Sequence, residues 1–171
     1  MKIQVGGLSE GLHTYRFTAP PSELGLPQEF NETVAVDATL EKAGGSLFLT
    51  ARLSTTAEWE CDRCVAPFRS PFASSYTMYY VWESEAAARF DPAEVQVIPA
   101  GLNMIDIADD VRQTIELSVP LKRVCREDCR GLCPHCGRNL NEGTCQCTST
   151  AVDGRWDKLK ELQTNTKHDV R

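Results

Sequence analysis

Residues 46–82 read SLFLTARLSTTAEWECDRCVAPFRSPFASSYTMYYVW and set the architecture that we expect for this chain. From Ser46 to Glu60, and again from Phe68 to Trp82, apolar and polar residues alternate, which is typical of half-buried strands. The motif Cys61-Asp62-Arg63-Cys64 separates the two runs, where the tip of a hairpin is expected. The sequence therefore predicts a long antiparallel hairpin with two thiols at its tip.

Further strands are predicted on both sides of this hairpin. Short stretches of alternating residues predict them at four places: 2–5, 12–17, 33–40 and 94–98. Gly44-Gly45 is typical of a two-residue hairpin turn. The three prolines of residues 20–27 predict a loop, and the acidic, alanine-rich residues 83–91 predict a loop or a short helix. The aromatic residues Tyr76, Tyr79, Tyr80 and Trp82 are expected to pack in the core and across strands rather than to stack on nucleic-acid bases.

A change of apolar spacing marks the main helix. From Asp106 the apolar residues recur every three or four positions, which predicts an amphipathic helix over residues 106–118. Ile107, Val111 and Ile115 form its apolar stripe, Asp106 can cap its first turn, and Pro120 ends it. A second, short helix is predicted over residues 157–163.

Charge and cysteine content divide the chain near residue 120. Residues 1–120 carry 8 basic and 17 acidic side chains, whereas residues 121–171 carry 10 basic and 7 acidic ones. Six of the eight cysteines lie between positions 125 and 147, and Leu132 and Leu140 are the only aliphatic residues there. Two leucines cannot order such a segment by burial. We therefore expect an α+β protein: a mainly antiparallel β region over 1–120 with one buried helix, and a cysteine-rich zinc-knuckle segment over 121–171 that docks on it.

Metal binding explains eight cysteines better than disulfides or reactive thiols. Disulfides need an oxidising compartment, and the first residues contain no apolar run of signal-peptide length. A C-x2-C pair followed by a C-x-C pair has the spacing of a closed zinc site. We therefore predict two zinc ions, each held by four cysteines, with the ligands Cys61, Cys64, Cys125, Cys129, Cys133, Cys136, Cys145 and Cys147. All-cysteine sites leave no open position for a substrate, so no enzyme activity is expected.

Two divisions of these ligands into tetrahedral sites remain open. In the preferred one, the last four cysteines close a local site, and the first four join the hairpin tip to the segment after the helix. In the other, the four cysteines from Cys125 to Cys136 form the local site, and Cys145 and Cys147 reach the hairpin tip.

Composition excludes several functions. A net charge of −6 and a pI near 5.1 argue against a protein that coats nucleic acid by bulk electrostatics. The sequence contains no run of 18 uncharged apolar residues, which a membrane-spanning helix would need. The glycine pairs are not followed by the helix and lysine of a phosphate-binding loop. A cytoplasmic protein is expected. Basic side chains gather near the cysteines and are the candidate RNA-binding residues: Lys122, Arg123, Arg126, Arg130, Arg138 and, if the long-range site forms, Arg63. The alternative is that they only offset the negative charge of the zinc-thiolate groups.

Several of these motifs together resemble a known family. They are Cys61-Asp-Arg-Cys64-Val-Ala-Pro-Phe68, a helix that ends in Ile115-Glu-Leu-Ser-Val-Pro120, the string from Cys129 through Cys133-Pro-His-Cys136 to Asn141, and Cys145-x-Cys147. Together they resemble the YceD family of large ribosomal RNA subunit accumulation proteins, in its full cysteine-rich form. The resemblance implies a factor in ribosome biogenesis rather than an enzyme.

The resemblance also implies partners. These are the large-subunit rRNA or its precursor, or a large-subunit ribosomal protein, with no role for DNA or a membrane. Two other functions stay open. An adaptor would engage a basic ribosomal protein through the acidic β region and use zinc only for structure. A thiol or zinc redox sensor would use the Cys61 and Cys64 thiols at an exposed hairpin tip.

Overall fold

The computed structural model describes residues 1–147 and residue 155. Its chain divides into two compact units, Met1–Cys129 and Arg130–Arg171, which we call the first and the second unit and describe separately. The helix expected over residues 157–163 lies outside the described residues, and the docking of residues 121–171 on the β region stays a prediction. No helix among the described residues is long and apolar enough to cross a membrane.

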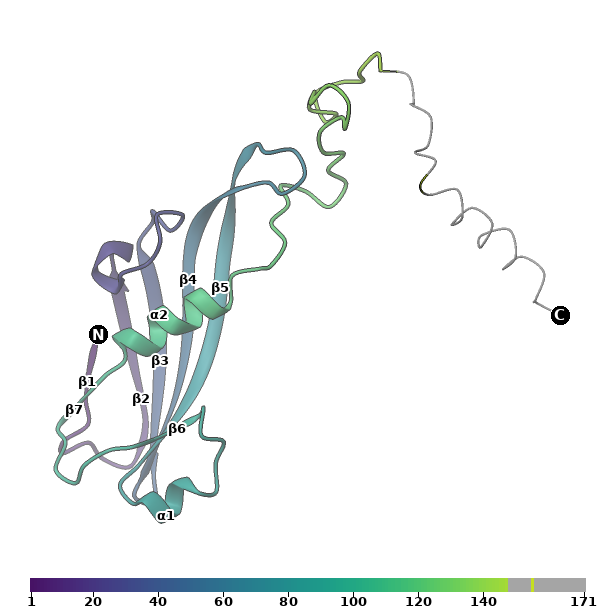
Figure 1. Cartoon of the computed structure of the whole chain (residues 1–171). Coiled ribbons are helices and arrows are strands. Elements are labelled where there is room, and N and C mark those ends of the chain that lie inside the picture. The colour runs from purple at the N-terminus through teal and green to yellow at the C-terminus, as the bar shows by residue number, and fades with distance from the viewer. Residues whose placement is uncertain (148–154, 156–171) are drawn as a thin grey trace. The chain divides into compact units, whose positions relative to one another are not determined.

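A five-stranded sheet forms the body of the first unit (Figure 1). Its strands, in spatial order, are β2 (Gly11–Ala19), β3 (Val34–Ala43), β4 (Ser46–Glu60), β5 (Pro67–Val81) and β6 (Val95–Val97). Strands β2 to β5 pair antiparallel, as expected from the alternating residues, whereas β6 pairs parallel with β5. Ala43 pairs with Ser46 around a turn in which Gly44 and Gly45 have φ values of 56° and 81°. Only glycine adopts this turn without strain, so Gly44-Gly45 fixes the β3–β4 register.

The remaining elements are short. Strands β1 (Lys2–Gln4) and β7 (Met104–Asp106) form a separate two-stranded sheet. The loop expected over residues 20–27 contains the 3₁₀ helix η1 (Pro21–Leu24), and residues 83–91 contain the short helix α1 (Ser84–Ala87). The main helix is α2 (Ala108–Leu117), and its first backbone N–H, that of Ala108, donates to the Asp106 carboxylate at 3.1 Å. The α+β composition expected from the sequence is confirmed, with sheet predominating.

The core lies between one face of the sheet and α2, which crosses that face in Figure 1. Ile107, Val111 and Ile115 on the helix side are fully buried, as their spacing predicted. Across from them, alternate residues of the strands are buried: Val34, Val36, Leu40, Leu47, Leu49, Ala51 and Leu53. A sheet with one face covered in this way shows clean alternation of apolar and polar residues, which is why the strands were legible in the sequence.

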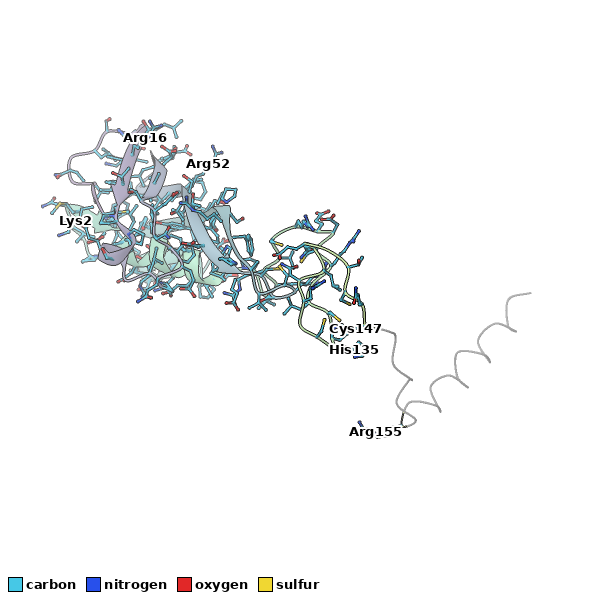
Figure 2. The ribbon with its side chains drawn as sticks, turned by 90° about the horizontal axis from the view of Figure 1, so that it is seen from above. Lys2, Arg16, Arg52, His135, Cys147 and Arg155 are labelled. Carbon is cyan, nitrogen blue, oxygen red and sulfur yellow. The ribbon has the colours of Figure 1, made fainter. Side chains whose placement is uncertain are left out.

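The other face of the sheet, which we call the open face, carries polar residues and an aromatic group. Arg16, Asp37 and Arg52 are side by side in the register of β2, β3 and β4, and Figure 2 shows the two arginines on the same side of the sheet. Tyr79 lies between the rings of Phe48 and Phe90, with centroid distances of 4.5 and 4.3 Å. The aromatic residues expected in the core therefore divide: Tyr80 is fully buried, but Tyr79 packs on the open face.

Strands β4 and β5 pair along their whole length, from Leu47 opposite Tyr80 to Glu60 opposite Pro67. Each has 15 residues, so the hairpin outruns the neighbouring strand β3, which has 10. The loop with Cys61 and Cys64 lies at the tip, and the predicted hairpin is confirmed. The strand expected over residues 94–98 is present as β6, but apolar periodicity does not give strand direction, so its parallel pairing with β5 was not predicted. The sequence missed β7, because a strand of three residues is too short to show a period.

Candidate metal centres

The first four cysteines meet at the hairpin tip, and we call them the tip site. Cys61 and Cys64 follow β4, while Cys125 and Cys129 come from the segment after α2. That segment is fixed to the tip by backbone contacts. The Asp62 N–H donates to the Arg123 carbonyl oxygen at 2.8 Å, and the Arg123 N–H donates to the Asp62 carboxylate at 2.6 Å. Residues more than 60 positions apart in the sequence are thus held as neighbours.

The sulfur atoms of the tip site are close and mostly shielded from solvent. The Sγ atoms of Cys61 and Cys129 are 3.9 Å apart, those of Cys64 and Cys125 are 3.8 Å apart, and all four lie within 4.8 Å of one another. Cys61, Cys64 and Cys129 are buried, and Cys125 is partly exposed. The sequence placed Cys61 and Cys64 at an exposed tip, but the chain after α2 covers their thiols.

The thiols of the tip site cannot all ionise in the absence of a cation. Burial raises the pKa of the Cys61 thiol, but the backbone N–H groups of Cys125, Cys64 and Arg63 outweigh this effect and lower it to about 6. Burial and the neighbouring Cys129 thiol raise the pKa of Cys125 to about 12. A thiolate beside a second thiol disfavours another negative charge there, and a bound metal ion removes that cost. The electrostatics of the group therefore favour a cation at its centre.

The last four cysteines form a second group, which we call the local site, inside the second unit. The Sγ atoms of Cys133 and Cys145 are 3.4 Å apart, and all four sulfurs lie within 4.8 Å of one another. Cys133 is buried, whereas Cys136 and Cys147 are exposed. The backbone N–H groups of Cys136 and His135 lower the pKa of Cys133 to about 6. This division of the eight cysteines is the first of the two considered above, and each group can hold a metal ion.

The two C-x2-C turns have the same hydrogen bonds. In the tip site, the Cys61 N–H donates to the Ala66 carbonyl oxygen at 3.0 Å, and the Val65 N–H donates to the Cys61 carbonyl oxygen at 2.8 Å. In the local site, the Cys133 N–H donates to the Arg138 carbonyl oxygen at 2.8 Å, and the Gly137 N–H donates to that of Cys133 at 2.9 Å. These turns aim backbone N–H groups at the sulfur atoms.

One residue in each turn has a left-handed backbone, and the two residues differ. Gly137 has a φ of 71° and Val65 a φ of 59°, and Val65 is the only non-glycine residue with a positive φ in the described part of the chain. A β-branched residue in this conformation is strained by about 1–2 kcal/mol. The sequence could have shown the equivalence, since both residues directly follow a C-x2-C pair.

Exchanging these residues tests the strain. We expect V65G to leave the free energy of unfolding unchanged or to raise it by up to about 1 kcal/mol, because relief of strain exceeds the entropy cost of glycine. G137V is expected to weaken metal binding at the local site about tenfold, equivalent to ~1.4 kcal/mol. Urea unfolding of V65G and metal competition on G137V measure both effects. A loss of more than about 1 kcal/mol in V65G would show that the valine is not strained.

The structure engages several of the candidate RNA-binding residues in contacts within the protein. The Arg63 guanidinium donates to the carbonyl oxygens of Glu127 and Cys129 at 3.0 and 2.9 Å. Arg123 lies 5.4 Å above the Trp59 ring. Arg126 pairs with Asp128 at 3.4 Å, and Arg138 donates to the Thr144 carbonyl oxygen at 3.2 Å. The side chains of Lys122 and Arg130 make no ion pair or hydrogen bond within residues 1–147.

Arg63 therefore positions the tip site. We expect R63A to lower the free energy of unfolding by about 1–3 kcal/mol, because a charged donor to two carbonyl oxygens is lost. R63K is expected to recover part of the loss, since an ammonium group can reach one oxygen but lacks the planar fork. Thermal unfolding of the metal-loaded protein checks this prediction, with R16A, which breaks the exposed Arg16–Asp37 pair, as the control. Equal losses in R63A and R16A would contradict it.

Nothing in the sequence indicates the clamp between Asp62 and Arg123 or the contact of Arg123 with Trp59. Each contact joins residues that are distant in the chain, and the spacing of the Cys61-Asp62-Arg63-Cys64 motif does not show which segment Asp62 meets. Only the C-x2-C spacing pointed to this region.

These features define a class: a β-sheet protein with two candidate four-cysteine metal sites, one closing the tip of its long hairpin. The chain belongs to the YceD family, because the family model for the large ribosomal RNA subunit accumulation protein YceD matches residues 49–163. This family has a role in large ribosomal subunit RNA accumulation.

Curated relatives cover parts of the chain. Uncharacterized proteins of Mycobacterium tuberculosis and Mycobacterium bovis are 28% identical over 127 residues, which are 74% of this chain and 60% of theirs. The chloroplastic large ribosomal RNA subunit accumulation protein YCED homolog 1 of Zea mays is 42% identical over 57 residues, 33% of this chain and 20% of the relative. The chain thus spans less than two thirds of the length of these relatives. No solved structure matches it.

Proposed function

We propose that this protein is a non-enzymatic factor for large-subunit rRNA accumulation in the cytoplasm, and that two structural zinc ions hold its RNA-contacting side chains in place. The observation that carries the proposal is the convergence of eight cysteines on two four-sulfur groups in a chain of the YceD family. The partner is the large-subunit rRNA or its precursor.

The geometry of the tip site supports zinc as the metal. A tetrahedral zinc ion with Zn–S bonds of about 2.3 Å places its sulfur ligands about 3.8 Å apart. The separations at the tip site, 3.8 and 3.9 Å, match this value. Zinc supplies a closed tetrahedral cross-link, and four thiolates leave no position for water or substrate. The proposal therefore gives the metal no catalytic role.

The contacts around the tip site support RNA contact by a short basic segment. Contacts of Asp62 with Arg123, and of Arg63 with Glu127 and Cys129, fix the backbone on both sides of Cys125. Lys122 is exposed, and the hydrogen bonds between its neighbour Arg123 and Asp62 hold its backbone in place. In the second unit, the Arg130 N–H donates to the Asn141 side chain at 2.9 Å, which fixes the base of an exposed arginine. Positioned cations of this kind suit phosphate contacts to folded RNA.

Only a local interaction is compatible with the charge of the whole chain. At a net charge of −6, and with each filled zinc site formally −2, long-range attraction to RNA is absent. Binding then depends on a few cations whose neighbours are fixed. Lys122 and Arg130 are the best candidates, because Arg126 and Arg138 have partners inside the protein and their replacement would also disturb the fold.

Crosslinking in cells with sequencing of the bound RNA tests the proposal. The native protein is expected to give discrete crosslinks to precursor large-subunit rRNA, and the double variant K122Q/R130Q to lose most of them while keeping two zinc equivalents. The control is R16Q/R52Q, which removes the same charge from the open face of the sheet (Figure 2). Equal crosslinking of both variants would overturn RNA contact through Lys122 and Arg130. A protein that is needed for rRNA accumulation but gives no specific crosslinks would instead be an adaptor.

A further inference from the structure

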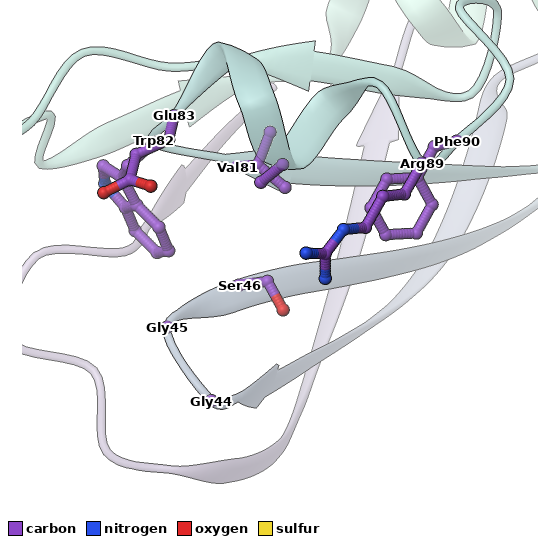
Figure 3. Close-up of a pocket in the computed structure, with 9 residues that line it drawn as sticks. Gly44, Gly45, Ser46, Val81, Trp82, Glu83, Arg89 and Phe90 are labelled. Atoms are coloured by element: carbon purple, nitrogen blue, oxygen red, sulfur yellow. The ribbon is translucent and has the colours of Figure 1, made fainter.

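A cavity lies at the end of the sheet that holds the β3–β4 turn, within the first unit. It has a volume of about 430 Å³ and is lined by residues of that turn, of the end of β5 and of the segment around α1 (Figure 3). This volume falls in the range of small-molecule sites. Its apolar lining includes the buried Val81. Neither the cysteine sites nor their arginines contribute to it.

Arg89, whose side chain has no partner among residues 1–147, lines this cavity. Figure 3 shows the Arg89 guanidinium directed toward Ser46 and the Gly44-Gly45 turn. It makes no ion pair or hydrogen bond with any side chain in the part of the chain that the structure describes. The segment that carries it is held in place, because the adjacent Phe90 ring stacks on Tyr79 at a centroid distance of 4.3 Å. An exposed guanidinium that lines a concave site on an anchored segment can bind a phosphate group.

The other walls fit a planar base. Trp82 and Phe90 supply aromatic rings, and an indole ring is a favourable surface for base stacking. A Cβ atom added at Gly44 or Gly45 would meet nothing within 4 Å, so a ligand can approach the backbone of the turn closely. The Glu83 carboxylate also lines the cavity and can accept hydrogen bonds from an amino group.

We propose that this cavity binds a nucleoside phosphate whose base carries an amino group, with the phosphate on Arg89, the base against Trp82 and the amino group on Glu83. The ligand chemistry is shared by a free nucleotide and by an unpaired nucleotide of RNA. Adenine, guanine and cytosine carry the exocyclic amino group, whereas uracil lacks it and its single N3–H donor lies between two carbonyl oxygens that a carboxylate disfavours. The pocket goes beyond the rRNA contact proposed above, because it does not involve the zinc sites.

Titration of the purified zinc-loaded protein tests the proposal. The probes are the four ribonucleoside 5′-monophosphates and short single-stranded RNAs with or without cytosine. Isothermal titration calorimetry measures the binding of each probe. R89A is expected to weaken binding at least tenfold, and A86L, which fills the cavity but retains the charged groups, to weaken it by a similar factor. R52A is the matched control, since it removes an exposed arginine outside the cavity. E83Q is expected to reduce the preference for cytidine over uridine monophosphate.

The outcomes distinguish a free nucleotide from an RNA nucleotide as the ligand, and they distinguish failure of the pocket from failure of the proposed rRNA contact. Binding of monophosphates that R89A and A86L weaken, but R52A does not, supports a free nucleotide. Binding of single-stranded RNA alone, with the same dependence, supports an unpaired nucleotide of RNA. Absence of both, or equal effects of R89A and R52A, overturns the pocket. Because K122Q/R130Q leaves the cavity intact, loss of crosslinks in that variant without an effect of R89A would retain the proposed function and reject the pocket alone.

Discussion

The variant C61S is expected to bind one zinc equivalent instead of two and to lose at least about 3 kcal/mol of unfolding free energy. Structural zinc contributes an apparent ~10–16 kcal/mol in small zinc-finger peptides, where it supplies nearly all of the stability. Here the sheet has its own core, so only part of that energy is at stake. The lost free energy comes from the contacts between the hairpin tip and the segment after α2, because Cys61 and Cys129 would hold these two parts around one metal ion.

Metal analysis and amide hydrogen exchange measure this effect. In C61S, the amides of Asp62 and Arg123, which donate to each other's residues in the native protein, are expected to lose their protection. Amides in the middle of β3 and β4 keep theirs. The matched control is C136S, which also removes one zinc ligand and one zinc equivalent but belongs to the local site. Protection of Asp62 and Arg123 that survives in C61S would show that the clamp does not depend on metal.

Chelation of the metal is expected to unfold residues 130–147 completely and to leave the sheet of the first unit folded. Among residues 130–147, only Gly131 and Cys133 are buried, so burial of apolar surface cannot order this stretch. The hydrogen bonds around Cys133 and Arg138 are too few to hold it without a cross-link. The first unit, in contrast, has a core of aliphatic residues between α2 and the sheet.

Nuclear magnetic resonance of the full chain checks the second expectation. After a strong chelator is added, amide signals from residues 130–147 are expected to collapse to unfolded positions, and signals from β2 to β5 to remain dispersed. Return of zinc restores the original spectrum. C136S is expected to show the same selective loss without a chelator. Retention of dispersed signals from residues 130–147 in the metal-free protein would contradict a structural role for the local site.

The sequence predicted those strands and helices that have one buried face, because such elements show a regular apolar period. Ser46–Glu60 alternates along its length because one sheet face packs on α2 and the other meets solvent, and the predicted limits of β4 agree with the structure. The helix stripe of Ile107, Val111 and Ile115 was found for the same reason. Tyr79 packs across strands on Phe48, as expected, but periodicity did not show that this pair lies on the open face. The strand expected over residues 94–98 is β6, whereas β7, with three residues, was missed because it is too short to show a period.

The candidate metal site was legible only in part. The spacing of Cys133, Cys136, Cys145 and Cys147 predicts a local group, since the ligands are close along the chain. Cys61 and Cys125 are 64 positions apart, and the spacing left two divisions of the ligands open. The burial of the tip thiols and the inward contacts of Arg63 depend on which segment covers the tip.

By itself, the sequence determined a mainly antiparallel sheet, a long hairpin with two thiols at its tip, one amphipathic helix and a cysteine-rich segment without a hydrophobic core. These properties follow from local period and composition, which each segment carries alone. Only the tertiary structure decided which cysteines share a site, that Val65 takes the place of a glycine, and which arginines face inward. The physical reason is that these depend on contacts between distant residues, such as Asp62 and Arg123, whose energies exist only once the hairpin and the segment after α2 have been brought together.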